Sequence, residues 1–360
     1  MRRDNTHMDH FEDRIVLAKK NPIHWIDDIC NDKVTWSRKW DGAPSIFVGR
    51  DEQGIYVAKK GIFNKNPKLY HTDDDIRNDL GDSPLADKLF VVLLTLKDCD
   101  LEIGDLVQGD LLFTRGDITN TKDGRSQFQA NTIVYQADGI LNSEWVGIVW
   151  HTRYIDTQAH YGHDIKSMIG ENCHGLYHFN ADDEIDPLDE DTKTLLSYMK
   201  KEYNRVKTDF SLNQMTVDLY VTYINSRIKE GTFSHDGNIT DFANFVVGRM
   251  NCAVDSAKRE DTKQKRMDLY GPVYDDLHKM VGVDKMHSIL YKMKMVILKS
   301  LNKSSSIDTY LKTKTGLRPT SHEGYVAINA HGIDAVKIVD RQEFSFANFS
   351  PEVIKGWTKD

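Results

Sequence analysis

The chain has 360 residues, enough for one large domain or two ordinary ones, and its 39% hydrophobic and 28% charged residues are the proportions of a globular protein. Its net charge of −8 excludes general attraction of polyanions, so contact with nucleic acid would need a local basic patch. The longest apolar runs fall short of the about 18 residues of a membrane span, and the first residues, MRRDNTHMDHFEDR, show no signal peptide core. The four cysteines form no Cys-x-x-Cys pair, which is typical of reduced thiols. We therefore expect no membrane contact and a cytoplasmic location.

Residues 34 to about 154 are predicted to form strands separated by turns. The segments SIFVGR and GIYVAKK flank residues 51–54, DEQG, which is a β-hairpin signal with a glycine where a positive φ is needed. Further strands are predicted in DLVQGDLLFT, NTIVYQA and WVGIVWHTRY, because they are rich in β-branched and aromatic residues. This part of the chain is predicted to pair mainly in antiparallel fashion.

The pattern changes from strands to helices near residue 182. The acidic segment ADDEIDPLDEDTK is predicted to lead into a long helix whose apolar face is formed by Leu195, Leu196, Met199, Tyr203, Val206 and Phe210. Similar patterns continue to Ile297 and are followed by LNKSSSIDTYLKTKTG, which is predicted to be a linker.

Strand character then resumes in EGYVAINAHGIDAVKIVD, with two short strands around residues 330–332. A closing helix is predicted with Ser350 as its N-cap and Pro351 as its first residue. The chain is thus predicted to be an α+β protein in which a helical insertion, residues 181–315, separates residues 1–180 from residues 316–360 of one domain.

Lys39, in the segment SRKWDGAPSIF, is a candidate nucleophile. A free lysine with a pKa near 10.4 is neutral in only about one molecule in two thousand at pH 7, so a nucleophilic lysine needs burial or neighbouring cations. If the hairpin turn is centred between residues 52 and 53, Lys60 lies opposite Ser45 and brings a second cation near Lys39. Lys60 is also suited to bind the phosphates of a nucleotide.

Asp41 and Gly42 follow the lysine and suit the same chemistry. A glycine lets the backbone approach a sugar or phosphate closely, and a short carboxylate can accept a hydrogen bond from a ribose hydroxyl. Taken alone, Lys-x-Asp-Gly is weak evidence, because it should arise by chance in about one in ten chains of this length.

Lys39-Trp40-Asp41-Gly42 resembles motif I of the covalent nucleotidyltransferases, which include ATP-dependent DNA ligases, RNA ligases and mRNA capping enzymes. The resemblance implies that Lys39 attacks the α-phosphate of ATP and carries AMP through a phosphoramidate bond. Lys60-Gly61 resembles the following basic element that contacts the nucleotide.

The central motifs of that superfamily also have counterparts. Gln108-Gly109-Asp110-Leu111 resembles motif III, usually Gly-Glu, with Asp110 as a shorter acid that would bind the ribose. Gly147-Ile148-Val149-Trp150 lies where motif IIIa places an apolar or aromatic residue against the purine, and Trp150 is the candidate.

Two further motifs come near the C-terminus. Glu323-Gly324-Tyr325-Val326 resembles motif IV, whose carboxylate serves a divalent metal, so the resemblance implies a Mg²⁺ or Mn²⁺ site on Glu323 with Asp110 as a second ligand. Lys337 resembles motif V, which normally has the form Lys-x-Lys. Here Ala335 or Val339 replaces one of the two lysines.

These resemblances imply a ligase-type nucleotidyltransferase domain of antiparallel sheets flanked by helices, with a large helical insertion. They also imply an ATP-dependent ligase that seals 5′-phosphate to 3′-hydroxyl ends. EGYV is similar to the form of motif IV in several phage RNA ligases, and only about twenty residues follow Lys337, too few for the OB-fold domain of DNA ligases and capping enzymes. RNA is therefore a better expected partner than DNA. Nearly the whole chain also resembles an uncharacterised family of tailed phages, which would place the protein in the host cytoplasm.

Three alternatives stay open at this point. The chain could be a DNA ligase. It could transfer AMP to another acceptor without sealing strands. It could also be a catalytically degenerate nucleic-acid-binding or virion-associated protein, an interpretation that the shortened motif V favours.

Overall fold

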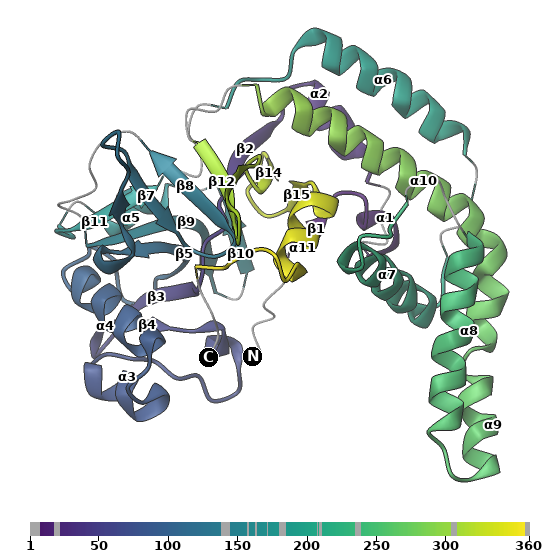
Figure 1. Ribbon diagram of the computed structural model, residues 1–360, viewed down its shortest axis with the longest axis horizontal. Coiled ribbons are helices and arrows are strands. Elements are labelled where there is room, and N and C mark those ends of the chain that lie inside the picture. Colours follow the sequence, from purple (N-terminus) through teal and green to yellow (C-terminus); the bar gives the residue numbers. More distant parts are fainter. Residues whose placement is uncertain are drawn as a thin grey trace.

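A computed structural model of the chain describes residues 8–17, 22–137, 145–156, 158–162, 164–170, 172–179, 185–206, 208, 211–234, 239–303 and 308–356. The fold is mixed α+β, as expected: antiparallel sheets flanked by helices (Figure 1). The sheets lie together on one side of the molecule, and a set of long helices reaches away from them as an arch (Figure 1).

The first sheet, sheet A, has the strand order β1-β15-β14-β2. β14 is antiparallel to both of its neighbours, whereas β1 runs parallel to β15. The hairpin predicted around residues 330–332 is confirmed, since it joins the two central strands. The strands are β1 (Asp9–His10), β2 (Val34–Lys39), β14 (Gly324–Asn329) and β15 (Ala335–Val339).

The second sheet, sheet B, has the order β10-β9-β5-β3-β4, and β11 pairs with β9 in parallel. The predicted hairpin is confirmed with the expected register, because Asp51 pairs with Gly54 at its turn. The strands are β3 (Ser45–Asp51), β4 (Gly54–Ala58), β5 (Leu106–Thr114), β9 (Val146–Ile155), β10 (Gln158–Tyr161) and β11 (Leu176–Phe179).

The third sheet, sheet C, has the order β13-β12-β8-β7-β6. β12 (Asp308–Thr313) lies in the segment predicted to be a linker, residues 301–316, and that prediction is wrong for β12; β13 (Gly316–Pro319) begins at the last residue of the segment. β12 pairs with β8 through Leu311 and Ile133, so a partner far away in the sequence turns this polar segment into a strand. The other strands are β6 (Thr119–Asn120), β7 (Ser126–Gln129) and β8 (Ile133–Ala137).

Helices from the first half of the chain pack against sheets A and B. α3 and α4 pack on sheet B, where Ile76 and Leu89 join Val48 and Val107 in one buried cluster. The helices near or between the sheets are α1 (Arg14–Leu17), α2 (His24–Cys30), α3 (Asp73–Leu80), α4 (Pro84–Leu96) and α5 (Ile165–Ile169), with the 3₁₀ turns η1 (Lys60–Phe63) and η2 (Arg115–Asp117).

The long helices form a separate block between β11 and β12. Asp189 caps the first of them by accepting a hydrogen bond from the Thr192 N–H, at the acidic lead-in that the sequence predicted. Tyr325 and Val336 of sheet A pack with these helices in the largest buried cluster. The helices are α6 (Glu190–Arg205), α7 (Gln214–Lys229), α8 (Ile239–Asp255), α9 (Glu260–Asp268) and α10 (Gly271–Leu301).

The last helix lies earlier than predicted. α11 spans Arg341–Phe349, with Asp340 as its N-cap and Ser350 at its C-terminal end. Ser350 and Pro351 therefore do not begin a helix; instead the chain continues to Val353, which forms a β-bridge with Thr313 of β12.

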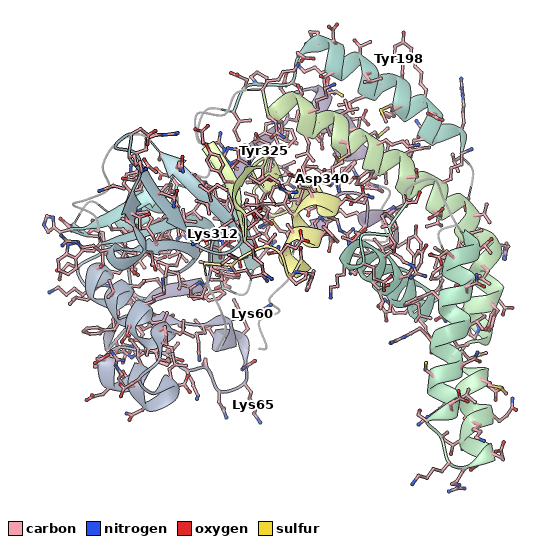
Figure 2. The ribbon with its side chains drawn as sticks, in the orientation of Figure 1. Lys60, Lys65, Tyr198, Lys312, Tyr325 and Asp340 are labelled. Atoms are coloured by element: carbon pink, nitrogen blue, oxygen red, sulfur yellow. The ribbon has the colours of Figure 1, made fainter. Side chains whose placement is uncertain are left out.

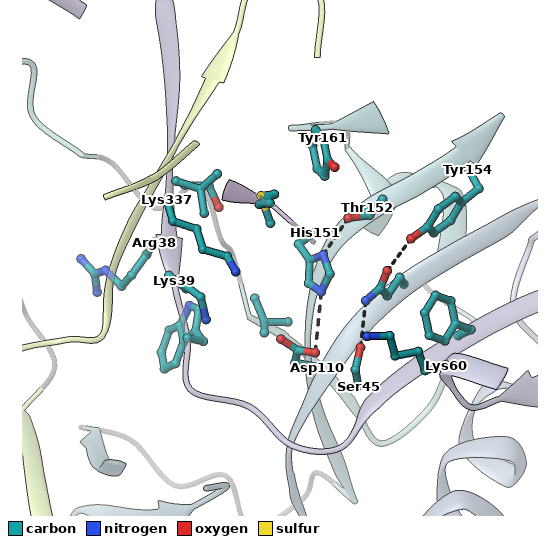
Figure 3. A pocket seen from close by; sticks show the side chains of 17 residues that line it. Arg38, Lys39, Ser45, Lys60, Asp110, His151, Thr152, Tyr154, Tyr161 and Lys337 are labelled. Carbon is teal, nitrogen blue, oxygen red and sulfur yellow. Dashed lines mark hydrogen bonds and ion pairs between the residues drawn. The ribbon is translucent and has the colours of Figure 1, made fainter. Parts of the chain in front are cut away.

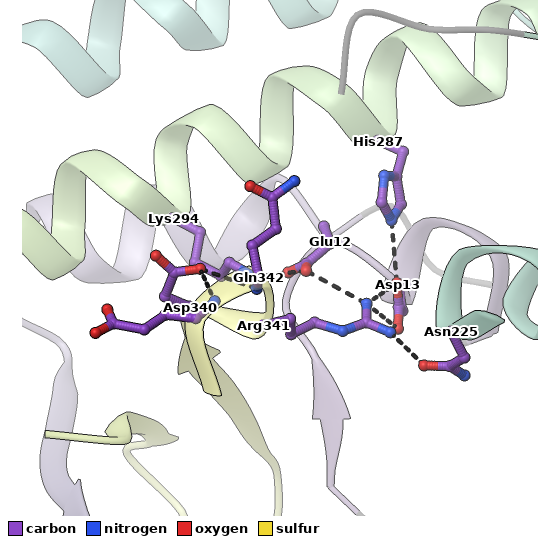
Figure 4. A network of polar contacts seen from close by, with 9 residues as sticks. Glu12, Asp13, Asn225, His287, Lys294, Asp340, Arg341 and Gln342 are labelled. Carbon is purple, nitrogen blue, oxygen red and sulfur yellow. Dashed lines mark hydrogen bonds and ion pairs between the residues drawn. The ribbon is translucent and has the colours of Figure 1, made fainter. Parts of the chain in front are cut away.

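A buried ionic network joins the helical block to sheet A (Figure 4). Arg341 donates to both carboxylate oxygens of Asp13 at 2.9 Å, and Lys294 of α10 donates to Glu12 at 2.5 Å. His287 lies 3.0 Å from the Asp13 carboxylate. All five side chains are almost fully buried, so removing one partner would leave an unpaired buried charge.

Among the described residues, no helix combines the length and the apolar character needed to cross a lipid bilayer.

Candidate functional site

A cavity of about 250 Å³ lies between sheets A and B and brings distant parts of the chain together. Lys39 and Lys337 line it from sheet A, Asp110 lines it from sheet B, and Lys60 lies at the start of η1 (Figure 3). Four of the residues predicted from the sequence motifs therefore share one cavity.

Lys39 ends β2 and is paired in the sheet with Gly324, the first residue of β14. Gly324 has a φ of 146°, and a Cβ there would lie 2.4 Å from the Ile338 carbonyl oxygen, so only glycine fits. This geometry places Glu323 beside the lysine, with 2.6 Å between its Oε2 and the Lys39 Nζ. The Glu-Gly pair thus positions the carboxylate against the candidate nucleophile.

The ion pair sets the protonation of both groups. Burial lowers the pKa of Lys39, but Glu323 above all, with Asp110 and Asp41, raises it above its ordinary value. Burial raises the pKa of Glu323 to about 7, against the opposing charge of Lys39. Lys39 keeps the higher pKa, so the proton stays on its amine in the free protein.

Lys337 lies on β15 opposite Val326, and both side chains border the cavity. Burial and the charge of Lys39 lower the pKa of Lys337 to about 8. Ala335 and Val339 flank it at the positions two residues away, which share its face of the strand, and both are buried apolar side chains. No second motif lysine therefore stands beside Lys337.

Asp110 lies on β5, with 3.7 Å between its Oδ1 and the Nε2 of His151. Burial raises the pKa of this carboxyl, but His151, Lys39 and Ser45 together lower it below its ordinary value. Gly42 touches the same residue, since a Cβ at position 42 would lie 2.6 Å from the Asp110 Cβ. Gly42 therefore lets the segment that follows Lys39 pack closely against Asp110 on β5.

Asp41 does not line the cavity. Its buried carboxylate accepts hydrogen bonds from the Thr132 and Ile133 N–H groups at 2.7 and 2.9 Å and from the Asn131 amide at 2.8 Å. We expected Asp41 to contact a ribose, but the structure uses it to hold the loop at residues 131–133, because three donors already occupy its oxygens.

Trp150 also points away from the cavity. It is 6% exposed, packs in the cluster beneath α4, and donates its Nε1–H to His178 Nδ1 at 3.2 Å. Its neighbours on β9, Val149 and His151, line the cavity instead. Val149 and Trp150 face opposite sides of the strand, and a register shift follows Trp150, where β9 pairs Thr152 with Gln108. The expectation that Trp150 stacks on a purine is therefore wrong.

Sequence reasoning missed a polar chain along one wall of the cavity (Figure 3). Tyr154 donates its hydroxyl to Gln108 Oε1 at 2.6 Å, and Gln108 donates its Nε2 to Ser45 Oγ at 2.9 Å. Phe47 closes the cavity beside them. Strict alternation along WVGIVWHTRY does not predict this wall, because a register shift between β9 and β5 turns Thr152 and Tyr154 to the same cavity as Val149 and His151.

The expected metal site rests on two carboxylates. The described residues contain no group of three or more His, Cys, Asp or Glu side chains that could hold a metal ion. Glu323 and Asp110 both raise the pKa of Lys39, so both carboxylates lie near its amine. One or two carboxylates with phosphate oxygens satisfy Mg²⁺, so this pair fits a metal that arrives with a nucleotide.

The chain belongs to a family described as "Family of unknown function (DUF6267)", whose model matches residues 5–353. No curated protein matches the chain. No solved structure matches it either.

Proposed function

We propose that the protein is an ATP-dependent polynucleotide ligase, with RNA favoured over DNA, that works through lysyl-AMP on Lys39. The observation that carries the proposal is the meeting of Lys39, Asp110 and Lys337 in one cavity, with Glu323 2.6 Å from the lysine amine. These residues come from segments separated by up to 298 positions, and they follow one another along the chain in the order of the motifs that they resemble.

In the first step, the Lys39 Nζ forms a bond to the α-phosphorus of ATP while the bond from that phosphorus to the pyrophosphate oxygen breaks. Glu323 is within hydrogen-bond distance of the amine and has a pKa near 7, so it is suited to take the Nζ proton. Lys337 and Lys60 border the same cavity and offset the negative charge of the phosphates.

Glu323 and Asp110 are the residues that would hold Mg²⁺ or Mn²⁺, and the metal would neutralise charge on the phosphates. Asp110, as an ionised carboxylate, accepts a hydrogen bond from a ribose hydroxyl. Val149 and Val326 supply apolar contacts to the base from the two sheets.

In the later steps, the AMP passes to a 5′-phosphate end, and a 3′-hydroxyl then displaces it to join the strands. The preference for RNA rests on the resemblance of EGYV to motif IV of several phage RNA ligases. AMP transfer without sealing is the alternative that the same site would support.

The test is incubation with α-labelled ATP and Mg²⁺ or Mn²⁺, followed by denaturing electrophoresis. Wild type is expected to carry label, Lys39→Arg to carry none, and Lys59→Arg, a matched change of a lysine outside the cavity, to label like wild type. An unlabelled wild type whose intact mass is not raised by about 329 Da, the increment for one AMP, would refute the proposal.

The acceptor is tested separately with single-stranded RNA and DNA bearing 5′-phosphate and 3′-hydroxyl ends. Joined RNA supports the proposal in full. Label on Lys39 with no joined product from either polymer would point to AMP transfer to another acceptor.

A further inference from the structure

Lys337 reaches the cavity from a strand whose other face packs on the helical block. β15 turns Lys337 to the cavity, whereas its neighbours Val336 and Ile338 lie in the largest buried cluster. Leu290 and Met293 of α10 belong to the same cluster. Because neighbouring strand residues point to opposite faces, α10 supports the strand directly behind Lys337.

The strand on the outer side of Lys337 is very short. β1 has two residues and lies at the edge of sheet A, next to β15. His10 is paired with Lys337, and the Phe11 N–H donates to the Lys337 carbonyl at 3.1 Å. Strands usually have about 3–10 residues, so the few hydrogen bonds of β1 need support from other contacts.

The buried ionic network supplies this support where both strands end. Glu12 and Asp13 come soon after β1, and Arg341 comes soon after β15 (Figure 4). The Arg341 Nη1 donates to both carboxylate oxygens of Asp13 at 2.9 Å. This contact joins the two segments that leave the strands, so it fixes β1 against β15.

α10 holds the β1 side of the network. Lys294 donates to Glu12 at 2.5 Å, and His287 lies 3.0 Å from the Asp13 carboxylate. Burial raises the pKa of Asp13, but the charge of Arg341 and the hydrogen bond with His287 lower it below its ordinary value. Asp13 therefore stays an anion, and its contacts with Arg341 and α10 are ionic.

α7 holds the β15 side of the network. The Arg341 Nη2 donates to Asn225 Oδ1 of α7 at 2.7 Å. Asp340, which precedes Arg341, lies where the sheets meet the long helices (Figure 2). Arg341 thus contacts the end of β1 through Asp13 and the helical block through Asn225, only four residues after Lys337. The planar guanidinium donates in fixed directions, which suits it to hold these parts in one arrangement.

We propose that Arg341 is a positioning residue for Lys337 and that, through the buried ionic network, it sets the place of the Lys337 amine against the phosphates of the bound nucleotide. The proposal rests on the proposed function, because it takes Lys337 to be a cation beside the phosphates of ATP. It gives the helical block a role at the site that requires no contact with the nucleotide. A misplacement of about 1 Å at a reacting site can cost about a hundredfold in rate, so the place of β15 affects turnover.

The test measures AMP labelling of the full chain over a range of ATP concentrations. The variants are Arg341→Met and Arg341→Lys, and the second keeps the charge while it removes the bidentate geometry. The control, Asp276→Ala, removes another buried carboxylate of the helical block, which accepts hydrogen bonds from the Asn213 N–H and the Thr216 hydroxyl. Asp276 precedes His287 by about 16 Å along α10, so its loss leaves the network intact.

Arg341→Met is expected to raise the ATP concentration for half-maximal labelling by at least about tenfold, because a displaced Lys337 no longer meets the phosphates. Arg341→Lys is expected to raise it by a smaller factor, since a lysine donates as a point charge and not as a fork. Asp276→Ala is expected to change it by less than about twofold, although it lowers the free energy of unfolding. If Arg341→Met does not fold, Arg341→Lys carries the comparison with the control.

Lys337→Ala supplies the background in which an effect through Lys337 is lost. Two residues that act through one contact have non-additive effects, so Arg341→Met or Arg341→Lys is expected to change the ATP concentration by less than about twofold in this background. The same loss in both backgrounds would overturn the proposal, because Arg341 would then act without Lys337. A loss of equal size in Asp276→Ala would overturn it too, because general destabilisation would explain the effect.

Hydrogen exchange of residues 8–17 and 335–340 reports on the two strands without any catalysis. The Arg341 variants are expected to speed the exchange of the Phe11 amide, whose acceptor is the Lys337 carbonyl, while Asp276→Ala leaves it unchanged. Unchanged exchange in a folded Arg341 variant would overturn the proposal. If wild type is never labelled with AMP but the exchange speeds up as expected, the proposed function fails and the assignment of Arg341 to the position of β15 stands.

Discussion

Replacing Asp41 by alanine tests whether this residue serves the fold or the nucleotide. Its carboxylate holds the loop at residues 131–133, and Gly356 and Asn348 bind the same loop from the C-terminal side. Asp41 therefore ties the Lys39 segment to the end of the chain. The removal of its carboxylate is expected to loosen this connection, while every residue that lines the cavity stays in place.

The expected loss of stability follows from the contacts of the Asp41 carboxylate. Two backbone N–H groups, of Thr132 and Ile133, lose a charged acceptor in a buried place, while the Asn131 amide can turn toward water. A hydrogen bond to a charged group contributes about 1.5–3 kcal/mol, so Asp41→Ala is expected to lower the free energy of unfolding by about 3–5 kcal/mol.

The assay is denaturant unfolding followed by tryptophan fluorescence, since Trp40 is buried beside the mutated position. Asp110→Ala is the matched control: its carboxylate faces the cavity, and its loss is expected to change stability by less than about 1 kcal/mol while lowering AMP labelling. An Asp41→Ala protein as stable as wild type but unable to take up AMP would refute the reasoning.

Three further predictions concern the site and its support. Burial raises the pKa of Glu323 to about 7, so the folded state still holds a proton that the unfolded state loses near pH 4.5. The free energy of unfolding is therefore expected to fall as the pH rises from about 4.5 to 7. Glu323→Gln is expected to remove up to about 3 kcal/mol of this decline, measured by unfolding at pH 5 and pH 7.5. Trp150→Phe is expected to change the ATP concentration for half-maximal labelling by less than about twofold relative to wild type, whereas His151→Ala is expected to raise it. A larger effect of Trp150→Phe than of His151→Ala would contradict the placement of His151, and not Trp150, in the cavity. Arg341→Met leaves Asp13 without its bidentate partner and is expected to cost about 3–5 kcal/mol in thermal or denaturant unfolding; a neutral effect would show that the network is not needed.

Local signals in the sequence were sufficient for the elements whose partners are close along the chain. The hairpins of β3 with β4 and of β14 with β15 follow from turn residues and strand-forming segments, and α6 follows from its acidic cap and apolar periodicity. The α+β class was predicted in the same way. Motif order along the chain also selected Lys39, Lys60, Asp110 and Lys337, which meet in one cavity.

Tertiary structure decided what depends on partners distant in the sequence. The segment of β12 became a strand because β8 offered it an edge, and no local pattern indicates that partner. The start of α11 has a local signal, the cap by Asp340, but the contact of Arg341 with Asp13 joins it to a distant part of the chain.

The tertiary structure also decided the orientation of individual side chains. Strict alternation along β9 would turn Thr152 and Tyr154 to the same side as Trp150. The register shift in the pairing of β9 with β5 instead turns them to the cavity together with His151, and the sequence by itself did not predict this irregularity.

Asp41 also follows Lys39 by two residues in the sequence, but only the tertiary structure shows that its carboxylate accepts hydrogen bonds from backbone N–H groups of the loop at residues 131–133. Residue types and their order thus selected side chains that meet in one cavity, while the faces and partners of those side chains arose from sheet pairing, which no local pattern encodes.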